Sequence, residues 1–169
     1  MLKLATQVAS PDIHAILGLD RFATRDFPLD WPTGQRLGFE LRIRPVLRTS
    51  EGKERDVYLA AVDKHAPTDT QLSRETIYAE WLCTELARGN AATIEDMQLE
   101  GFRLSASLRK GTPGLGKRPA RRVAGPDATF KGHLSVRDPA GFAALLSRGI
   151  GRHRAFGFGM LLLRPPESC

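Results

Sequence analysis

Residues 37–45 read LGFELRIRP, a stretch in which apolar side chains alternate with charged side chains or glycine. A period of two residues is typical of a β-strand that buries one face and keeps the other face polar. We therefore predict a half-buried strand here. Its apolar face consists of Leu37, Phe39, Leu41 and Ile43, and its polar face carries Arg42 and Arg44.

The chain after this strand alternates between helical and extended patterns. An apolar stripe at helical spacing predicts a helix over residues 74–88, for which Ser73 can serve as the N-cap. Asp138 and Pro139 supply an N-cap and a first-turn proline for a second, short helix, and Gly149 ends it. The predicted strands span residues 57–62, residues 94–108 with a bend near Gly101, residues 129–136 and residues 155–163.

The order of the main elements from residue 37 is β-α-β-β-α-β, leaving aside the short strand over residues 57–62. This order is that of an α+β, ferredoxin-like (RRM-like) domain, in which two helices cover one face of a sheet. A cluster of prolines and a glycine over residues 28–34 precedes this domain and marks a subdomain boundary.

Length and composition limit the classes of protein. The 169 residues are 41% hydrophobic and 26% charged, which suits one compact soluble domain or two very small ones. No apolar run approaches the roughly 20 residues that span a bilayer, and the first residues lack the apolar core of a signal peptide. We therefore expect a cytoplasmic protein without a membrane partner. Its two cysteines form neither a disulfide framework nor a zinc motif.

The net charge of +6 is unevenly distributed along the chain. Residues 50–100 hold eleven acidic and five basic residues, whereas residues 101–135, called the basic segment below, hold eight basic residues against Asp127 alone. Glycines and prolines between residues 111 and 119 interrupt the basic segment, which predicts a basic loop that joins the strands over residues 94–108 and 129–136 and is suited to phosphate contacts. A solvated loop without a ligand is the alternative. The basic residues are Arg103, Arg109, Lys110, Lys117, Arg118, Arg121, Arg122 and Lys131.

Residues 148–159 read RGIGRHRAFGFG and are called the glycine-rich loop below. Glycines allow close approach of a backbone to a ligand, and arginines bind phosphate oxygens with paired hydrogen bonds. The loop follows a helix and leads into a strand, which is the reverse of the order in nucleotide-binding loops, and no Gly-Lys-Ser/Thr is present. We therefore exclude nucleotide hydrolysis and expect a phosphate-rich polymer as the ligand.

The pattern Gly-Ile-Gly-Arg-x-x-Ala-Phe-Gly-x-Gly over residues 149–159, preceded by a strand, an Asp-Pro and a short helix, resembles the CRISPR repeat-processing endoribonucleases, specifically the CasE subfamily that works with Cascade. Residues 32–45 are similar to the first strand of that family's second ferredoxin-like half, and residues 80–82 to its next helix. The resemblance covers roughly residues 30–165. It implies binding of the CRISPR repeat stem-loop, cleavage of precursor CRISPR RNA, and continued binding of the guide hairpin beside other Cascade-type subunits.

Members of this family usually have two ferredoxin-like halves, and the first helix of the first half carries the histidine thought to act in cleavage. Only about thirty residues precede the second half here. The resemblance therefore implies a shortened N-terminal ferredoxin-like portion, residues 1–33, and a C-terminal ferredoxin-like RNA-binding domain, residues 34–169. It leaves open a non-catalytic subunit that binds the hairpin without cutting it.

The family's reaction implies attack by a ribose 2′-hydroxyl without a metal or another cofactor, leaving a 2′,3′-cyclic phosphate. Such a reaction needs an acid, a base and cationic support. His153, inside the glycine-rich loop, is the preferred candidate, and His14 is the second because its Pro-x-x-His pattern is similar to that of the first helix in the family's first half. Arg154 matches a position where many relatives carry a lysine that stabilises the reacting phosphate. His133 is expected to be structural and His65 solvated.

No His/Asp/Glu cluster has metal-ligand spacing, so we expect no metal site. A ferredoxin-like metabolic or regulatory module without RNA is a further alternative, disfavoured by the basic segment together with the glycine-rich loop. The predicted RNA-binding residues are Arg109, Lys110, Lys117, Arg118, Arg121, Arg122, Lys131, Arg148, Gly149, Gly151, Arg152, Gly157 and Gly159.

Overall fold

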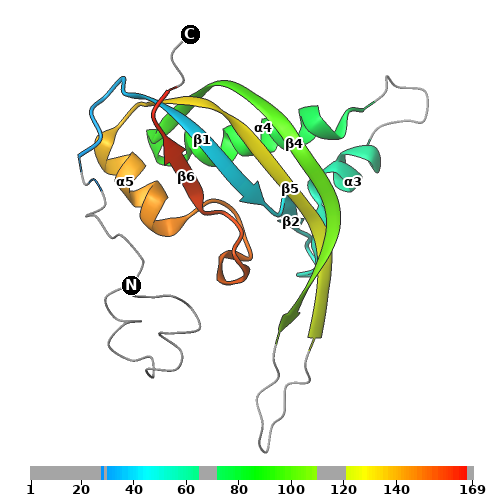
Figure 1. The fold of residues 1–169 in the computed structure, drawn as a ribbon. Coiled ribbons are helices and arrows are strands. Elements are labelled where there is room, and N and C mark those ends of the chain that lie inside the picture. Colours follow the sequence, from blue (N-terminus) through cyan, green and yellow to red (C-terminus); the bar gives the residue numbers. More distant parts are fainter. Residues whose placement is uncertain (1–27, 29, 65–71, 110–120, 167–169) are drawn as a thin grey trace, which may run out of the picture.

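The computed structural model describes residue 28 and residues 30–64, 72–109 and 121–166. Four strands form an antiparallel sheet in the order β4–β5–β1–β6 (Figure 1). This order places the first and third main strands at the centre, as in a ferredoxin-like fold, and the predicted α+β class is confirmed. The strands are β1 (Arg36–Ile43), β4 (Ala92–Arg109), β5 (Arg121–Val136) and β6 (Leu161–Arg164).

Two helices, α4 (Arg74–Ala87) and α5 (Pro139–Arg148), pack against one face of the sheet. The Asp138 carboxylate caps α5 by accepting a hydrogen bond from the Gly141 amide at 2.5 Å, as predicted, whereas the Ser73 side chain makes no capping bond to α4. Neither these helices nor the shorter ones in the described ranges are long and apolar enough to cross a membrane.

The hydrophobic core lies between the sheet and these helices. Alternate residues of β1 and β5 point into it, because the pleat of a strand sends successive side chains to opposite faces. Its fully buried members include Phe39, Leu41 and Ile43 from β1, Phe130 and Leu134 from β5, Tyr78, Leu82 and Leu86 from α4, and Phe142 from α5.

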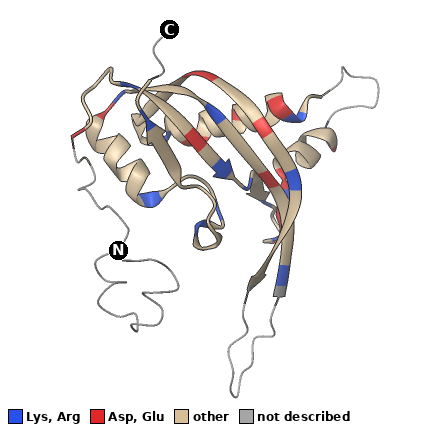
Figure 2. Ribbon diagram, in the orientation of Figure 1, with Lys and Arg blue, Asp and Glu red and all other residues tan. Residues whose placement is uncertain are grey.

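The other face of the sheet, called the open face below, is polar. The side chains that alternate with the core residues pair across the sheet. Arg36 of β1 forms an ion pair at 2.7 Å with Glu95 of β4, on the far side of β5, and Nδ1 of His133 on β5 lies 3.0 Å from the Asp96 carboxylate on β4. Figure 2 shows acidic and basic positions side by side on these strands. Most of the charge on the open face is therefore compensated within the sheet.

The predicted strand over residues 57–62 is wrong, because these residues form helix α3 (Val57–Val62). The Asp56 carboxylate accepts a hydrogen bond from the Tyr58 amide at 2.8 Å and so caps a helix where we expected a short strand. The extended residues lie just before it, in a two-stranded hairpin of β2 (Val46–Arg48) and β3 (Glu54–Asp56).

Two other strand boundaries also differ from the prediction. The strand expected over residues 129–136 already begins at Arg121, because the extended pairing of β4 with β5 runs from Ala92 opposite Val136 to Arg109 opposite Arg121. The register shifts between Leu99 and Gly101, which confirms the bend near Gly101. Figure 1 shows this two-stranded ribbon reaching beyond the rest of the sheet.

The last strand begins at Leu161, later than the expected residue 155. Residues before it form a short 3₁₀ helix, η3 (Arg154–Phe156), flanked by His153 at φ 62° and Gly157 at φ 81°. These left-handed backbone conformations are incompatible with a continuous strand.

Candidate functional site

The glycine-rich loop joins α5 to β6 and is attached to the end of β1. The Ile150 amide donates to the Gly159 carbonyl at 2.8 Å, and the Gly159 amide donates to the Arg42 carbonyl at 2.7 Å. The Ile150 side chain is buried in the core. These contacts close the loop on itself and place its arginines at one end of the sheet (Figure 2).

The four glycines of the loop all have positive φ, but their surroundings differ. A Cβ on Gly159 would lie 2.0 Å from the Ile150 carbonyl oxygen, and one on Gly151 would lie 2.8 Å from the Trp81 ring. A Cβ on Gly149 would lie 2.9 Å from the Gly159 carbonyl oxygen, whereas one on Gly157 would meet open space. Packing within the protein therefore requires three of these glycines, and Gly157 alone leaves room for a ligand.

His153 contacts a carboxylate that is far away in the sequence. Its Nε2 lies 2.5 Å from Glu54 Oε2, while the Arg152 Nε donates to Glu54 Oε1 at 2.6 Å. The His153 side chain is only 11% exposed. Because a carboxylate accepts hydrogen bonds, this contact places a ring proton on Nε2 and leaves Nδ1 as the nitrogen available to a ligand.

Glu54 remains ionised in this position. Burial raises the pKa of its carboxyl, but the hydrogen bonds from His153 and Arg152 outweigh burial, so that the pKa is lowered overall. The resulting carboxylate holds both side chains of the loop.

A buried network fixes the strand that carries Glu54. Two residues further along β3, the Asp56 carboxylate accepts a hydrogen bond from the Tyr78 hydroxyl at 2.8 Å and one from Arg74 at 2.9 Å. Burial, followed by the Asp56 carboxylate, raises the pKa of the Tyr78 hydroxyl, which therefore stays protonated and donates. Glu54 thus lies on a hairpin anchored to α4.

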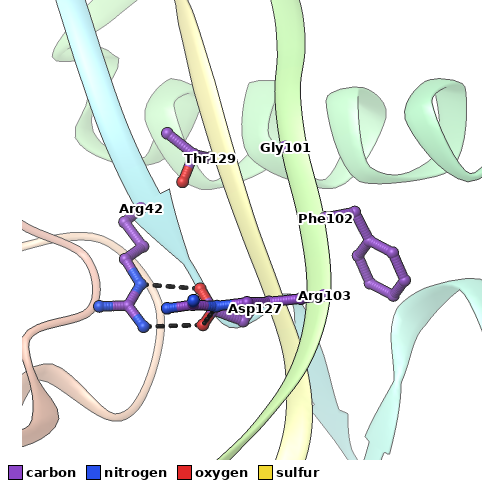
Figure 3. A pocket seen from close by; sticks show the side chains of 6 residues that line it. All are labelled: Arg42, Gly101, Phe102, Arg103, Asp127 and Thr129. Carbon is purple, nitrogen blue, oxygen red and sulfur yellow. Dashed lines mark hydrogen bonds and ion pairs between the residues drawn. The ribbon is translucent and has the colours of Figure 1, made fainter.

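A second cluster surrounds Asp127 on the open face (Figure 3). Arg42 binds both carboxylate oxygens of Asp127 with hydrogen bonds of 2.7 Å, and Arg103 Nε donates to one of them at 3.0 Å. The hydrogen bonds from Arg42 hold the pKa of the Asp127 carboxyl well below its usual range, although burial opposes this effect. Asp127 is only 3% exposed, so the arginines replace the water it has lost.

This cluster also contacts the glycine-rich loop through Phe158. The guanidinium carbons of Arg42 and Arg44 lie 4.7 Å and 4.6 Å from the centre of the Phe158 ring. Phe158 is buried, and both cations lie within the range of cation–π attraction. The loop is therefore bound to the sheet through a side chain as well as through its backbone.

The predicted site residues of the loop engage different partners. His153 and Arg152 contact Glu54, whereas Arg154 donates through its Nη1 to the carbonyl of Arg148, the last residue of α5. Arg148 and Arg154 are exposed, and the Arg152 side chain is 47% exposed. The structure thus brings His153 and three cations onto one loop without joining them in a single hydrogen-bond network.

The predicted residues of the basic segment are placed in part. Arg109 and Arg121 are paired in the ladder at the far end of the β4–β5 ribbon, and Arg122 is exposed beside them. Lys131 lies on the open face. Its Nζ is 3.9 Å from Glu40 Oε2 and 3.3 Å from Glu100 Oε2, so two carboxylates offset its charge. His14, Lys110, Lys117 and Arg118 lie outside the described residues, as does His65.

Sequence reasoning missed Glu54 and the role of Asp127. Glu54 lies 99 positions before His153, and nothing in its local sequence distinguishes it from other glutamates. Asp127 did carry a signal, since it is the one acid among eight basic residues. No group of three His, Cys, Asp or Glu side chains that could hold a metal occurs among the residues that the structure describes.

Comparison with known proteins defines the class. The family model of the CRISPR associated protein matches residues 3–165, so the chain belongs to this family. The predicted resemblance to CRISPR repeat-processing endoribonucleases of the CasE type is confirmed by this family match together with a solved endoribonuclease structure at 25% identity. A comparison with curated proteins gives no match.

A structure of the CRISPR endoribonuclease Cse3 bound to 19 nt RNA has 25% sequence identity and a TM-score of 0.62, over 85% of this chain and 63% of that chain. A structure of Thermus thermophilus Cse3, bound to an RNA that represents a pre-cleavage complex, has 23% identity and a TM-score of 0.58. The match covers 85% of this chain and 60% of that chain. A chain of a CRISPR RNA-guided surveillance complex has 19% identity and a TM-score of 0.55, over 86% and 66%. This chain thus spans about three fifths of the length of the Cse3 chains.

Proposed function

We propose that the chain binds the stem-loop of CRISPR repeat RNA and cleaves precursor CRISPR RNA without a metal. It then stays on the guide hairpin in a Cascade-like complex. Membership in the family and the fold shared with an RNA-bound endoribonuclease at 25% identity support this proposal. The exposed arginines of the glycine-rich loop, together with those of the β4–β5 ribbon, are the phosphate-binding groups.

The contact between His153 and Glu54 is the observation that carries the cleavage step. With Nε2 bound to Glu54, the ring exchanges protons through Nδ1. In the proposed reaction the 2′-hydroxyl gives its proton to Nδ1 of His153 as its oxygen bonds to phosphorus. The bond from phosphorus to the 5′-oxygen breaks, and the 5′-oxygen takes up a proton from the same ring. Arg154 stabilises the negative charge that develops on the phosphate oxygens.

Cleavage is tested with a repeat stem-loop RNA from the genome that encodes the chain, in excess EDTA. We expect a 2′,3′-cyclic phosphate on one product and no cutting of an RNA with a 2′-deoxy group at the scissile nucleotide. His153→Ala should slow single-turnover cleavage by about 10²–10⁴-fold with hairpin affinity nearly unchanged. The control His133→Gln removes a histidine on the open face and should cut at the normal rate.

Glu54→Gln tests whether the carboxylate positions the ring. We expect cleavage to slow by about tenfold or more while the Kd for the hairpin stays the same, because the amide can no longer hold both His153 and Arg152 as a carboxylate does. Glu51→Gln, in the turn of the same β2–β3 hairpin and paired with Lys53 at 2.8 Å, is the matched control. Equal rates for the two variants would remove Glu54 from the mechanism.

A second candidate function is a subunit that holds the hairpin without cutting it. The low exposure of His153 favours it, since the ring already has a partner. An unmodified chain that binds the hairpin and leaves it intact in every condition would establish this alternative. If His14→Ala abolishes cutting and His153→Ala does not, the reacting histidine is His14.

A further inference from the structure

A pocket of about 340 Å³ lies on the open face over three neighbouring strands. In the sheet register, Gly101 of β4 and Arg42 of β1 both lie beside Thr129 of β5, and Arg103 lies beside Asp127. Gly101 contributes no side chain, and a Cβ there would meet no atom within 4 Å. Figure 3 shows Arg42 and Arg103 converging on Asp127 at one end of this space, with Phe102 directed away from it.

The cluster holds more positive charge than its carboxylate needs. Arg42 alone occupies both oxygens of Asp127, yet Arg103 joins the same carboxylate and Arg44 lies close enough to interact with its charge. Three guanidinium groups thus act on the Asp127 carboxylate, and the other carboxylate that acts on Arg44, Glu54, is already bound by Arg152 and His153. Arg103 binds Asp127 through Nε only, and its two terminal nitrogens donate to no residue in the part of the chain that the structure describes. Its side chain is 70% exposed.

This arrangement suits an anion with several oxygens. Asp127 fixes the planes of Arg42 and Arg103, so that their remaining N–H groups are already ordered before a ligand arrives. Ordered guanidinium groups bind phosphate oxygens with two parallel hydrogen bonds, and the hydroxyl of Thr129, on the pocket wall, can add another.

The pocket adjoins the glycine-rich loop. The Arg42 carbonyl accepts a hydrogen bond from the Gly159 amide, and the Arg42 guanidinium lies against Phe158 of the loop. A polymer with a phosphate at the loop therefore passes within reach of Arg42. We propose that the Arg42–Arg103 pocket binds a backbone phosphate of a single-stranded RNA segment that continues from the glycine-rich loop across the open face. This inference rests on the proposed function for the identity of the polymer.

The test measures binding of fluorescein-labelled pentauridylate to the full chain by anisotropy over a series of salt concentrations. Arg103→Gln should weaken binding by about tenfold, because it removes charged hydrogen bonds to phosphate. It should lower the slope of log K against log salt by about 0.7, the value for one phosphate contact on a single strand. Arg103→Lys should keep the slope, since it keeps the charge, and should bind more weakly than the unmodified chain because the guanidinium geometry is gone.

Arg36→Gln is the matched control. Arg36 is also on the open face, forms an ion pair with Glu95 as Arg103 does with Asp127, and is 45% exposed against 70% for Arg103. The variant should bind pentauridylate as the unmodified chain does. Thermal unfolding of both variants checks that the fold is retained. Equal losses of affinity in Arg103→Gln and Arg36→Gln would show an effect of net charge alone and would overturn the proposed phosphate site. Unchanged affinity in Arg103→Gln would overturn it as well.

The same variants separate this inference from the proposed function. If the repeat hairpin is bound and cut normally while pentauridylate binding does not depend on Arg103, the pocket is wrong and the proposed function stands. If the unmodified chain neither binds nor cuts the hairpin, but pentauridylate binding depends on Arg103 and not on Arg36, the pocket stands without that function.

Discussion

Asp127 shows how a single residue sets the properties of its surroundings. A carboxylate that is nearly inaccessible to water is costly unless charged partners compensate it. Arg42 and Arg103 supply this compensation from two strands, β1 and β4, that both neighbour β5, and thereby join these strands through the side chain of a third. The one acidic residue of the basic segment thus orders Arg103 of that segment together with Arg42 of β1.

Replacement of Asp127 by Asn should lower the free energy of unfolding at neutral pH by about 1.5–3 kcal/mol, because the charged hydrogen bonds are lost. The folded-state pKa of Asp127 lies below the ordinary 3.8 of the unfolded chain, so the carboxylate stabilises the fold above that value. This stabilisation declines as pH falls from about 4 toward the folded-state pKa.

Urea unfolding of both proteins over a pH series measures this difference. The gap in stability between the unmodified chain and Asp127→Asn should narrow steadily below pH about 4. A gap that stays constant down to pH about 2 would contradict the assignment of the low pKa to Asp127.

In the glycine-rich loop, a positive φ favours glycine at several positions, but close packing excludes a side chain at only some of them. Gly159 combines a positive φ with a hydrogen-bonded contact to Ile150, whereas Gly157 has a positive φ and open space around it. The two glycines are close together in the loop and share the same type of conformation. They therefore form a matched pair that separates conformational strain from steric exclusion.

Gly157→Ala should cost about 1–2 kcal/mol of unfolding free energy, the cost of a left-handed conformation for a residue with a Cβ. Gly159→Ala should cost clearly more, because its Cβ would meet a carbonyl oxygen at 2.0 Å and the loop would have to move. Chemical denaturation of the two variants gives the comparison. Equal costs would mean that the loop relaxes freely and does not hold His153 in place.

Over the described part of the molecule, ion pairs compensate charge on the sheet away from the Arg42–Arg103 pocket, whereas basic residues at the ends of the sheet are exposed. Ion pairs between strands offset Arg36 and Lys131 on the open face, whereas Arg122 on the β4–β5 ribbon and Arg148 at the end of α5 are exposed. Figure 2 shows basic residues at the end of the ribbon and in the glycine-rich loop. An RNA that contacts both regions would approach the molecule from its ribbon end.

The double variant Arg121→Ala with Arg122→Ala should weaken binding of the repeat hairpin. It should also lower the log-log salt slope by about 0.9 for each duplex-stem phosphate that the variant no longer neutralises. The control is Arg55→Ala with Arg88→Ala, which changes the net charge equally but removes arginines paired with Asp63 and Glu85. If both double variants change the slope alike, the ribbon makes no specific contact with the RNA.

The strands and helices of the core could be predicted because their signals are local. Alternation over residues 37–45 and the stripe of α4 each reflect burial on one face of a single element, and Asp138 and Gly149 mark the ends of α5 through their own backbone and side-chain chemistry. Two predictions were wrong for local reasons. Asp56 caps a helix over residues 57–62 where a strand was expected. Positive φ angles in the glycine-rich loop prevent an extended backbone there, so β6 begins later than expected.

The order of the main elements, the family resemblance and the loop that carries His153 could all be predicted from the sequence. The contacts of that loop could not, because they form only in the folded chain. Glu54 reaches His153 across 99 positions, and Arg42 reaches Asp127 across 85. Such pairs leave no periodic trace along the chain, because their partners come together only when the sheet pairs β1 with β5 and the hairpin of β3 folds against α4.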